Sequence, residues 1–303
     1  MTQTSQPKIS IGLPVYNGER YLAEAIESIL AQTFVDFELI ISDNASEDAT
    51  REICLRFATG DSRIRYHRNE RNLGAGPNFN RTFALARGEY FKWAAHDDLL
   101  EPEFLERCLL ALEADPTAVL CQTMIKHVDE FGLPIRAWYG PLLGVDHPDP
   151  SRRFAQAVLT TDHSCEDIFG LIRTHVLATM PLHEGCLDTD RIVLAELALR
   201  GRFIHVPERL FIQREHGKRF LNAAYSDRDA RIAWYDPTQL GDRSWHSWKV
   251  YRSYYAAVGR SSLDWPERLR CYGHLLRWLS VNSDVVLRLF DFKYYSLGRK
   301  AVS

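Results

Sequence analysis

The sequence predicts an α/β fold in which helices cover both faces of a mostly parallel central sheet, followed by a mostly helical C-terminal segment. Two observations lead to this prediction. Over residues 1–125, short apolar runs alternate with stretches of helical spacing that are roughly 10 to 15 residues long, a pattern typical of parallel sheets. The last 63 residues differ in composition, since they hold 11 Lys and Arg against 5 Asp and Glu and four of the seven tryptophans.

Five strands and four helices are expected within the first 125 residues. The expected strands cover residues 9–13, 37–41, 63–67, 90–94 and 118–123, and the expected helices cover residues 19–32, 48–57, 78–86 and 102–114. Leu22, Ile26 and Ile29 show the spacing of the first helix, and Pro14 is expected to end the first strand. Ligands bind outside the carboxyl ends of such strands, so site residues are sought just after each one.

The pattern is weaker after residue 125. The expected elements are a turn at 129–132, a Gly- and Pro-rich loop at 140–150, a helix at 190–200 and strands at 202–206 and 209–213. We divide the chain into an α/β domain and a C-terminal segment. The domain covers residues 1–225, with halves at 1–125 and 126–225, and the segment covers residues 226–303.

Composition and charge argue against several classes of protein. A net charge of -3 does not suit a general nucleic-acid binder, which normally carries a basic excess. Residues 1–8 lack the apolar core of a signal peptide, and no long apolar run predicts a membrane-spanning helix. The six cysteines form no CxxC pair, so we expect buried free thiols in a reducing compartment and a cytoplasmic location.

Polar residues follow four of the expected strands. They form Pro14-Val15-Tyr16-Asn17-Gly18-Glu19, Asp43-Asn44-Ala45-Ser46-Glu47-Asp48, Arg71-Asn72-Leu73-Gly74 and His96-Asp97-Asp98. A nucleoside diphosphate needs such a set. An aromatic ring can stack on the base, a carboxylate can accept its imide N–H, a cation can contact phosphate, and paired acids can hold a hard divalent ion.

The order of these motifs resembles glycosyltransferase family 2, whose members have the GT-A fold, over residues 9–216. The family's motifs are Pro-x-Tyr-Asn, matched by Pro14, Tyr16 and Asn17; Asp-x-x-Ser-x-Asp-x-Thr, matched by Asp43, Ser46, Asp48 and Thr50; and Asn-x-Gly, matched by Asn72 and Gly74. The resemblance implies that Asp43 reads the base, usually uracil, and that the Tyr16 loop flanks it. The donor-binding residues that we predict are Pro14, Tyr16, Asn17, Glu19, Asp43, Arg71, Asn72, Gly74 and Asp97.

The family's metal motif, Asp-x-Asp-Asp, is altered here to Ala95-His96-Asp97-Asp98. The resemblance implies that Asp97 faces a divalent ion, Mn²⁺ or Mg²⁺, with Asp98 beside it. It leaves open whether His96 replaces the ribose contact of the missing acid. Members frequently carry Arg-x-His, which makes His216 a further candidate ligand. The alternative is that Asp97 and Asp98 cap the next helix and that His216 is a surface residue.

Inverting members place a general base at the start of a helix about a dozen residues before a glycine. Counting back from Gly201 points to Asp190, and Asp188 is the competing acid. Residues two apart on a helix point to nearly opposite sides, so Asp188 and Asp190 cannot both face the substrate if both are helical. Members often have Glu where Thr189 stands, and an alternative role for Asp190 is a helix N-cap.

The resemblance therefore implies inverting transfer of a sugar from a nucleotide sugar, UDP-linked, to an acceptor hydroxyl that Asp190 deprotonates. The acceptor is expected to be a glycan or a lipid-linked precursor in bacterial surface polysaccharide assembly. Two alternatives stay open. A sugar nucleotidyltransferase would need a Gly-rich loop with Arg and Lys after the first strand. A catalytically degenerate nucleotide-sugar-binding module would agree with Ala95 and Thr189.

The C-terminal segment allows two interpretations. Apolar residues recur at helical spacing among arginines after Trp265, at Leu269, Tyr272, Leu275, Leu276 and Leu279, and residues 285–295 repeat the mixture. Basic amphipathic helices of this kind can contact the inner face of the plasma membrane. The same spacing is more typical of helices that pack their apolar stripe onto a core, and we favour that interpretation.

Overall fold

The computed structural model describes residues 6–136, 141–160, 165–183, 187–217, 228–240 and 246–282. Its strands are β1 (Ile9–Val15), β2 (Phe37–Asp43), β3 (Ile64–Arg68), β4 (Tyr90–Trp93), β5 (Leu99–Leu100), β6 (Ala118–Val128), β7 (Leu171–Arg173) and β8 (Arg202–Arg214). They form an eight-stranded sheet in the order β3-β2-β1-β4-β7-β6-β8-β5. The pairs β1–β2, β1–β4, β2–β3 and β6–β8 are parallel, whereas β7 pairs antiparallel with β4 and β6, and β5 with β8.

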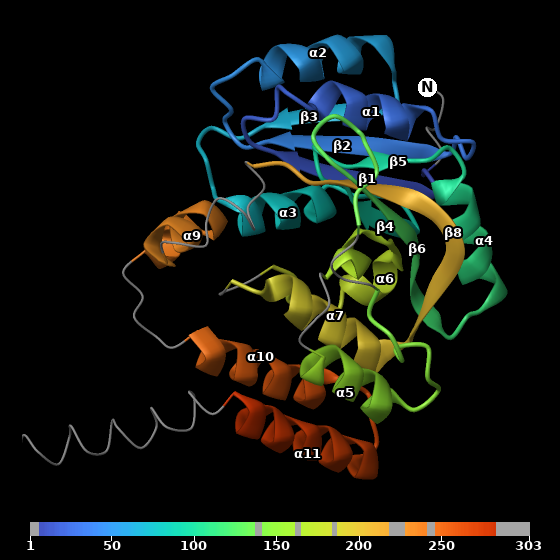
Figure 1. Ribbon diagram of the computed structural model, residues 1–303, viewed down its shortest axis with the longest axis vertical. Coiled ribbons are helices and arrows are strands. Elements are labelled where there is room, and N and C mark those ends of the chain that lie inside the picture. Colours follow the sequence, from blue (N-terminus) through green and yellow to red (C-terminus); the bar gives the residue numbers. More distant parts are fainter. Residues whose placement is uncertain are drawn as a thin grey trace, which may run out of the picture.

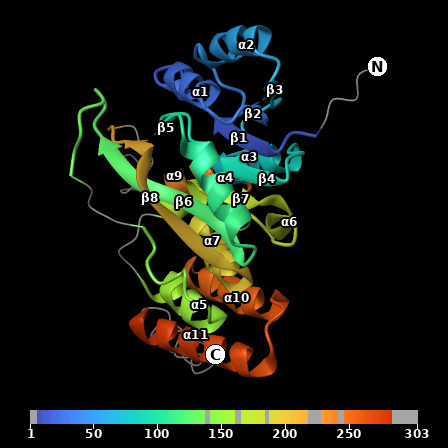
Figure 2. The ribbon, with the colours of Figure 1, turned by 90° about the vertical axis from the view of Figure 1, so that its right-hand side faces the viewer.

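Helices cover both faces of this sheet, as predicted (Figure 1). They are α1 (Leu22–Leu30), α2 (Thr50–Gly60), α3 (Ala75–Ala84), α4 (Phe104–Ala114), α5 (Pro150–Leu159), α6 (Thr174–Leu177), α7 (Thr189–Arg200), α9 (Arg228–Tyr235), α10 (His246–Arg260) and α11 (Trp265–Val281), with short 3₁₀ turns η1 (Glu166–Phe169) and η2 (Pro237–Gln239). Figure 2 shows β6 and β8 running side by side through the molecule, between the N-terminal strands and helices α5, α10 and α11.

The prediction that Pro14 ends the first strand is wrong, because β1 continues to Val15. The carbonyl of Gly12 accepts from Ala94 on the β4 side, and that of Val15 accepts from Asn44 on the β2 side. The backbone polar groups of successive residues point to opposite edges of a strand, so those of Pro14 face β4, as those of Gly12 do. The pairing of β1 with β4 has already ended at Gly12. The N–H that proline lacks therefore has no ladder partner to lose.

Two further predictions need correction in the second half. Residues 202–206 and 209–213 form one strand, β8, and Pro207 lies between them where the β6 register shifts from Thr123 to Met124. Proline is tolerated at such an irregularity. Helix α5 was not predicted, although Asp149 caps it through the N–H of Ser151 and Pro150 opens it.

The core consists of two buried apolar clusters, which include residues from the two faces of β4. One combines β1, β2, α1 and α4, with Leu13, Ile26 and Phe104 fully buried. The other joins α5 and α7 to α10 and α11 through residues such as Tyr254 and Leu275. The helices α10 and α11 therefore share a core with the second half of the α/β domain. The expected boundary at residue 225 lies outside the described residues.

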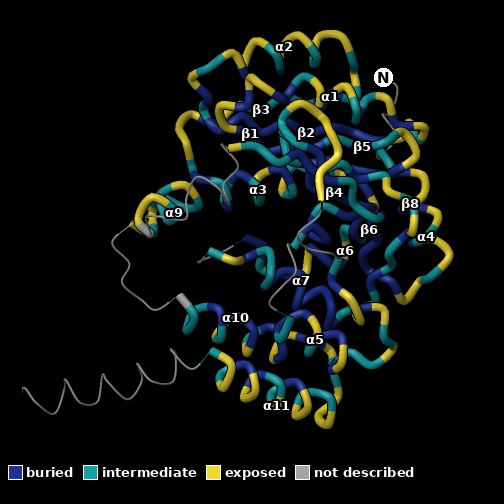
Figure 3. The backbone as a smooth tube through the Cα atoms, in the orientation of Figure 1, coloured by how far each residue is buried: buried dark blue, intermediate teal, exposed yellow. Residues whose placement is uncertain are grey.

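Helix α11 packs through only part of its apolar surface. Cys271, Leu275 and Trp278 face the core, as the packing interpretation expects. Leu269 and Leu276, from the stripe that the spacing predicted, are 53% and 66% exposed, so part of this stripe lies on the outer face of α11. Figure 3 shows exposed positions along that helix. The second stretch, residues 285–295, lies outside the described residues. Within those residues, no helix is both long and apolar enough to cross a membrane.

The cysteines follow the expectation where the structure describes them. Cys54, Cys108, Cys121 and Cys271 are buried free thiols, and Cys165 is partly buried. Cys186 lies outside the described residues.

Candidate active site

The Asp-x-x-Ser-x-Asp-x-Thr motif holds the loop that follows β1. Ser46 Oγ accepts from the N–H of Asn17 (2.9 Å), Thr50 Oγ1 from that of Gly18 (2.8 Å), and Asp48 Oδ2 from that of Glu19 (3.1 Å). Three consecutive N–H groups of a tight turn are thus satisfied by side chains of the next loop, which fixes the two loops relative to each other. Asn17 itself is left-handed, with a φ of 51°.

Asn44 joins the loop after β2 to the loop after β3 and was not singled out in the sequence. Its amide N–H₂ donates to Asn72 Oδ1 (2.7 Å) and to the carbonyl of Gly74, while its Oδ1 accepts from Asn69 Nδ2 and from the N–H of Leu73. Asn44 follows a predicted strand end directly, which is the signal that could have identified it. The Asn72 and Gly74 motif is held in place by this network.

Asp43 lies beneath these loops with its side chain fully buried. Its Oδ1 accepts from the N–H of Ser46, and its Oδ2 accepts from Tyr66 (2.7 Å) and Arg68 (2.5 Å). Burial alone would raise the pKa of Asp43, but the hydrogen bonds from Ser46, Tyr66 and Arg68 outweigh it and lower that pKa. The carboxylate is therefore ionised and already bonded by protein groups.

A cavity of about 1070 Å³ opens at the carboxyl ends of β1, β2 and β4. The predicted site residues that line it are Pro14, Tyr16, Asn17, Glu19, Asn72, Asp97, Asp98 and His216. Those that do not line it are Asp43, Arg71, Gly74, Asp188 and Asp190. Arg71 is exposed, and the arginine that lines the cavity is Arg20, which pairs with Glu130 at 2.6 Å. Trp234 and Ala233 of α9 also line it, and they were not predicted.

Asp97 and His216 meet on one side of this cavity. The Nε2 atom of His216 lies 2.9 Å from Oδ2 of Asp97, and both side chains are largely buried. Asp98 Oδ1 accepts the N–H of Arg214, so it anchors the end of β8. The helix-capping alternative for this acid pair is wrong, because β5 intervenes and Glu103 is the N-cap of α4. His216 is likewise no isolated surface residue.

The Asp97–His216 pair fits a divalent ion. Ligands of Mg²⁺ lie about 2.1 Å from the ion, so neighbouring ligands at right angles are about 3 Å apart. The 2.9 Å between these two atoms is the length of the hydrogen bond that now joins them, and it is also compatible with two ligands of one ion. Within the ranges that the structure describes, no group of three or more His, Cys, Asp and Glu residues gathers as a metal site. A bound ion would take its remaining ligands from a diphosphate and water, as Mg²⁺ commonly does.

Asp190 lies in the first turn of α7. Asp188 occupies the N-cap position with a left-handed φ of 63°, so Asp190 is not the N-cap and the two acids are not both helical. The Asp190 side chain is 49% exposed. Burial of its carboxyl group, together with the nearby charge of Asp188, nevertheless raises the pKa of Asp190 to about 6. This value suits a general base at neutral pH, because the ionised form dominates while retaining basicity.

A buried histidine stands beside Asp190. Nδ1 of His183 lies 3.4 Å from Asp190 Oδ1 and 3.1 Å from Thr189 Oγ1. The His183 ring packs on Phe79, which lines the cavity, at a centroid distance of 5.1 Å. Asp190 thus reaches the border of the donor cavity through one intervening side chain. Sequence reasoning missed His183, which has no motif around it.

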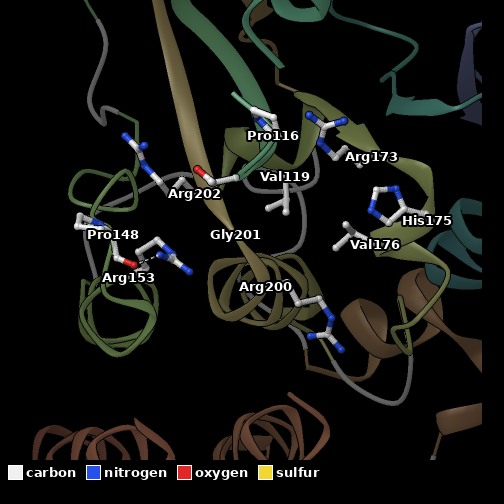
Figure 4. Close-up of a pocket in the computed structure, with 11 residues that line it drawn as sticks. Pro116, Val119, Pro148, Arg153, Arg173, His175, Val176, Arg200, Gly201 and Arg202 are labelled. Carbon is white, nitrogen blue, oxygen red and sulfur yellow. Dashed lines mark hydrogen bonds between the residues drawn. The ribbon is translucent and has the colours of Figure 1, made fainter. Parts of the chain in front are cut away.

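A second cavity of about 540 Å³ lies at the opposite end of β6 and β8 (Figure 4). Four arginines line it: Arg153, Arg173, Arg200 and Arg202. Their guanidinium groups donate mostly to backbone carbonyls, such as those of Ala198 and Leu112, and to Glu196 and Asp115. These bonds satisfy free backbone carbonyls at the C-terminal ends of α4 and α7, so a structural role explains the presence of the arginines.

Comparison with known sequences adds to this geometry. The sequence pattern of the family described as glycosyl transferase family 2 matches residues 10–177, more than half of the chain. An uncharacterized glycosyltransferase of Rickettsia typhi is 44% identical over 103 residues, which cover 34% of this chain and 31% of that protein. Chondroitin synthase of Escherichia coli is 33% identical over 126 residues, covering 42% and 18%. The chain thus matches less than half the length of these curated relatives.

Solved structures show the same fold. TarS of S. aureus, residues 1–349 in complex with UDP-GlcNAc, superposes with a TM-score of 0.64 at 18% identity, covering 90% of this chain and 73% of that one. The mannosyltransferase PcManGT from Pyrobaculum calidifontis, in complex with GDP-Man and Mn²⁺, superposes with a TM-score of 0.52 at 14% identity, covering 97% and 81%. At such identities the likeness concerns the fold alone, and it confirms the predicted GT-A-like architecture.

Proposed function

Because the chain belongs to glycosyl transferase family 2, we propose that it transfers a sugar from a nucleoside-diphosphate donor to an acceptor hydroxyl. The observation that carries this proposal is the convergence of three strand-end loops on one cavity, with Asp97 and His216 on one side of it. Asp190 does not line the cavity, but it contacts His183, whose ring packs on Phe79 in the cavity wall. A donor site and a general base are the two parts that such a transfer needs.

The donor side suits a nucleotide. We assign Tyr16, which is 39% exposed in the cavity, to the base, and the Asn17 and Glu19 turn to the neighbouring ribose or phosphates. UDP is the nucleotide that we propose, as in the TarS complex, with GDP as the comparison to be tested. Asp43 is proposed to act on the base, and any such contact uses the lone pair of Oδ1 that the N–H of Ser46 leaves, because Tyr66 and Arg68 both donate to Oδ2.

A divalent ion is proposed at Asp97 and His216, and Mn²⁺ is the first to test because the PcManGT complex contains it. When bound, such an ion offsets the charge that develops on a leaving diphosphate. The residues of this chain supply the rest. Asp98 holds the N–H of Arg214 and so positions the segment that carries His216. Arg20 lines the same cavity and supplies a fixed positive charge.

Inversion follows from the proposed role of Asp190. Its carboxylate accepts the proton of the acceptor hydroxyl, whose oxygen attacks the anomeric carbon opposite the departing diphosphate. A pKa of about 6 leaves Asp190 mostly ionised at pH 7. His183 stays neutral, because burial lowers its pKa to about 3, so the proton remains on Asp190 during the step.

The acceptor is proposed to be a glycan or a lipid-linked precursor, in keeping with the polymer-forming relative chondroitin synthase. The outer face of α11 supports a site of action at the inner face of the plasma membrane. Trp265, Leu269 and Leu276 are 66%, 53% and 66% exposed on one side of the helix, and the exposed Arg270 and Arg277 flank them. Apolar residues with neighbouring arginines suit an anionic lipid surface.

Liposome co-sedimentation tests this contact. Replacing Leu269 and Leu276 by Ser is expected to abolish binding to vesicles that contain anionic lipid, whereas Leu110→Ser, at a leucine of α4 that is 54% exposed, leaves it unchanged. If the variant with Ser at Leu269 and Leu276 binds as well as Leu110→Ser, or if the intact chain does not bind, the membrane assignment is refuted.

Donor binding and transfer are tested together. UDP-sugars and GDP-sugars are screened for thermal stabilisation with Mn²⁺, since a ligand that binds only the native state must stabilise it. The stabilising donor is then incubated with candidate glycan acceptors, and nucleoside diphosphate release is followed. Stabilisation with transfer supports the enzyme. Stabilisation without transfer or hydrolysis identifies a binding module. Formation of nucleoside triphosphate and sugar 1-phosphate from the donor when pyrophosphate is added identifies a nucleotidyltransferase.

A further inference from the structure

Helix α9 contacts both the donor cavity and the first turn of α7. Ala233 and Trp234 line the cavity, where Trp234 is 45% exposed. The next residue, Tyr235, bonds through its hydroxyl to Oγ1 of Thr189 at the start of α7. Figure 1 shows α9 beside the beginning of α3 and on the same side as the start of α7. One short helix therefore contacts the two halves of the proposed active site.

Two glycines on the donor side make room for α9. A Cβ atom at Gly76 would lie 2.7 Å from Cζ of the Tyr235 ring, and one at Gly74 would lie 2.5 Å from the Tyr235 carbonyl oxygen. Both distances are far shorter than a van der Waals contact. Gly74 also has a φ of 90°, a conformation that favours glycine. The Asn-x-Gly motif therefore supports α9 as well as the turn before α3.

On the acceptor side, polar contacts lead from Tyr235 to the base. The Tyr235 hydroxyl bonds to Thr189 Oγ1, which lies 3.1 Å from His183 Nδ1, and Nδ1 lies 3.4 Å from Asp190 Oδ1. A carboxylate only accepts hydrogen bonds, so we assign the imidazole proton to Nδ1. That proton then faces the carboxylate of Asp190 and the hydroxyl of Thr189.

The rest of the His183 environment does not fix which way Nδ1 points. Its ring is enclosed by Phe79 and Trp93, at centroid distances of 5.1 and 5.0 Å, and its Nε2 has no hydrogen-bond partner among the described residues. Asn80 bonds both the N–H and the carbonyl of His183, which holds the backbone only. The contacts with Thr189 and Asp190 are therefore what orient the imidazole.

We propose that Tyr235 is a positioning residue that links the donor site to the base: its ring rests on Gly76, and its hydroxyl fixes Thr189, which holds His183 against Asp190. This inference rests on the proposed function. It names no new reacting group, since Tyr235 acts on Asp190 through two other side chains. It predicts that the ring and the hydroxyl of Tyr235 affect different kinetic parameters.

The hydroxyl is tested by a double-mutant cycle in kcat. Tyr235→Phe keeps the ring on Gly76 and removes the hydroxyl, and Thr189→Val removes the other end of the same bond. Each is expected to lower kcat about tenfold with an unchanged KM for the donor, the effect of one lost hydrogen bond. Because both remove one link, the double variant is expected to lower kcat about tenfold as well. A loss of about 100-fold, or a wild-type kcat for Tyr235→Phe, overturns the proposal.

The ring is tested from the donor side. Gly76→Ala is expected to displace Tyr235 and to raise both the KM and the calorimetric Kd for the nucleoside diphosphate, by about tenfold. Gly273→Ala, in α11 where a Cβ meets nothing within 4 Å, is the matched control and leaves both values unchanged. Equal values for Gly76→Ala and the wild type refute the contact.

Failure of the proposed function is recognised separately. A wild-type chain that neither binds UDP or GDP with Mn²⁺ nor transfers sugar fails the proposed function itself. The same cycle is then measured as thermal unfolding midpoints of Tyr235→Phe, Thr189→Val and the double variant. Shifts that are not additive support the Tyr235–Thr189 contact, and additive shifts overturn it.

Discussion

The donor side and the acceptor side of the site are built differently. On the donor side, Asn44 alone bonds four partners in the loop after β3, and the Ser46, Asp48 and Thr50 side chains satisfy three consecutive N–H groups. On the acceptor side, the contacts that we trace among the described residues are those of Tyr235, Thr189 and His183 beside the base. A dense network preorganises a site for one class of ligand, whereas a sparse one leaves room for variation in the acceptor.

The largest expected effect is on the donor side. Asp97→Asn removes the charge that faces His216, and we expect kcat/KM to fall at least about 1000-fold, because an ion at a diphosphate contributes several kcal/mol to the transition state. EDTA should abolish transfer by the wild type. Asp98→Asn is the control: its amide oxygen can still accept from Arg214, so most activity should remain. Full activity in a metal-free preparation contradicts this assignment.

The next effect concerns the base. Asp190→Asn should lower kcat by roughly 100- to 10,000-fold while the Kd for UDP stays unchanged, which separates the two sides cleanly. A base works when ionised, so the wild-type kcat should rise with pH up to about 6 and level off above it. The Asn variant should lose this dependence. If Asp188→Asn is instead the inactive variant, the base is Asp188 and our register is wrong.

The two networks can be compared in stability. Asn44→Ala removes four hydrogen bonds to the loop after β3 and leaves the partly buried N–H of Leu73 without its partner, and we expect the free energy of unfolding to fall by about 2 to 4 kcal/mol. Thr189→Val, on the acceptor side, should lower it by only about 1 kcal/mol. Urea unfolding measures both. Equal losses would mean that the acceptor side is as tightly built as the donor side.

The smallest effect is a gain in stability. The pKa of Asp190 is raised from 3.8 to about 6 on folding, so its ionised form opposes folding. The penalty is absent below pH 3.8, grows up to pH 6 and is constant above. The full shift corresponds to about 3 kcal/mol, and solvent at this half-exposed carboxyl reduces it to about 1 kcal/mol. Asp190→Asn should therefore be more stable than the wild type by about 1 kcal/mol at pH 8 and equally stable at pH 3.5. If the variant is more stable by the same amount at both pH values, the assigned cause is wrong.

The same contrast explains what the sequence could predict. Asn72 and Asp97 lie within a few residues of a strand end and line the cavity, so local pattern and resemblance placed them at this edge of the sheet. Tyr235 bonds to Thr189, which lies 46 residues earlier in the chain, and no local signal marks such a pair. His183 is close to Asp190 in the sequence, but no motif surrounds it. Arg71 was assigned to the cavity because arginine suits phosphate, but the network of Asn44 and Asn72 turns the loop so that Arg71 is exposed.

For the fold, elements with a regular period were predicted and those that depend on distant partners were not. Strands β1 to β4 and helix α7 were located to within a few residues. Pro14 and Pro207 misled the strand boundaries, because whether a proline is tolerated depends on the neighbouring strand. The exposed leucines of α11 were expected to pack, since spacing alone does not show which face meets the core.

The pairing of β8 with β6 has a consequence for folding kinetics. The two strands are parallel, and the whole of α5, β7 and α7 lies between them in the chain, so their contacts join residues far apart in sequence. Such contacts close late, because a long loop must lose its entropy first. His216 follows β8 directly and reaches Asp97 only when this strand has docked. A refolding chain should therefore recover its far-ultraviolet helical signal before it can bind a metal ion, and ion binding would report the last step of the folding reaction.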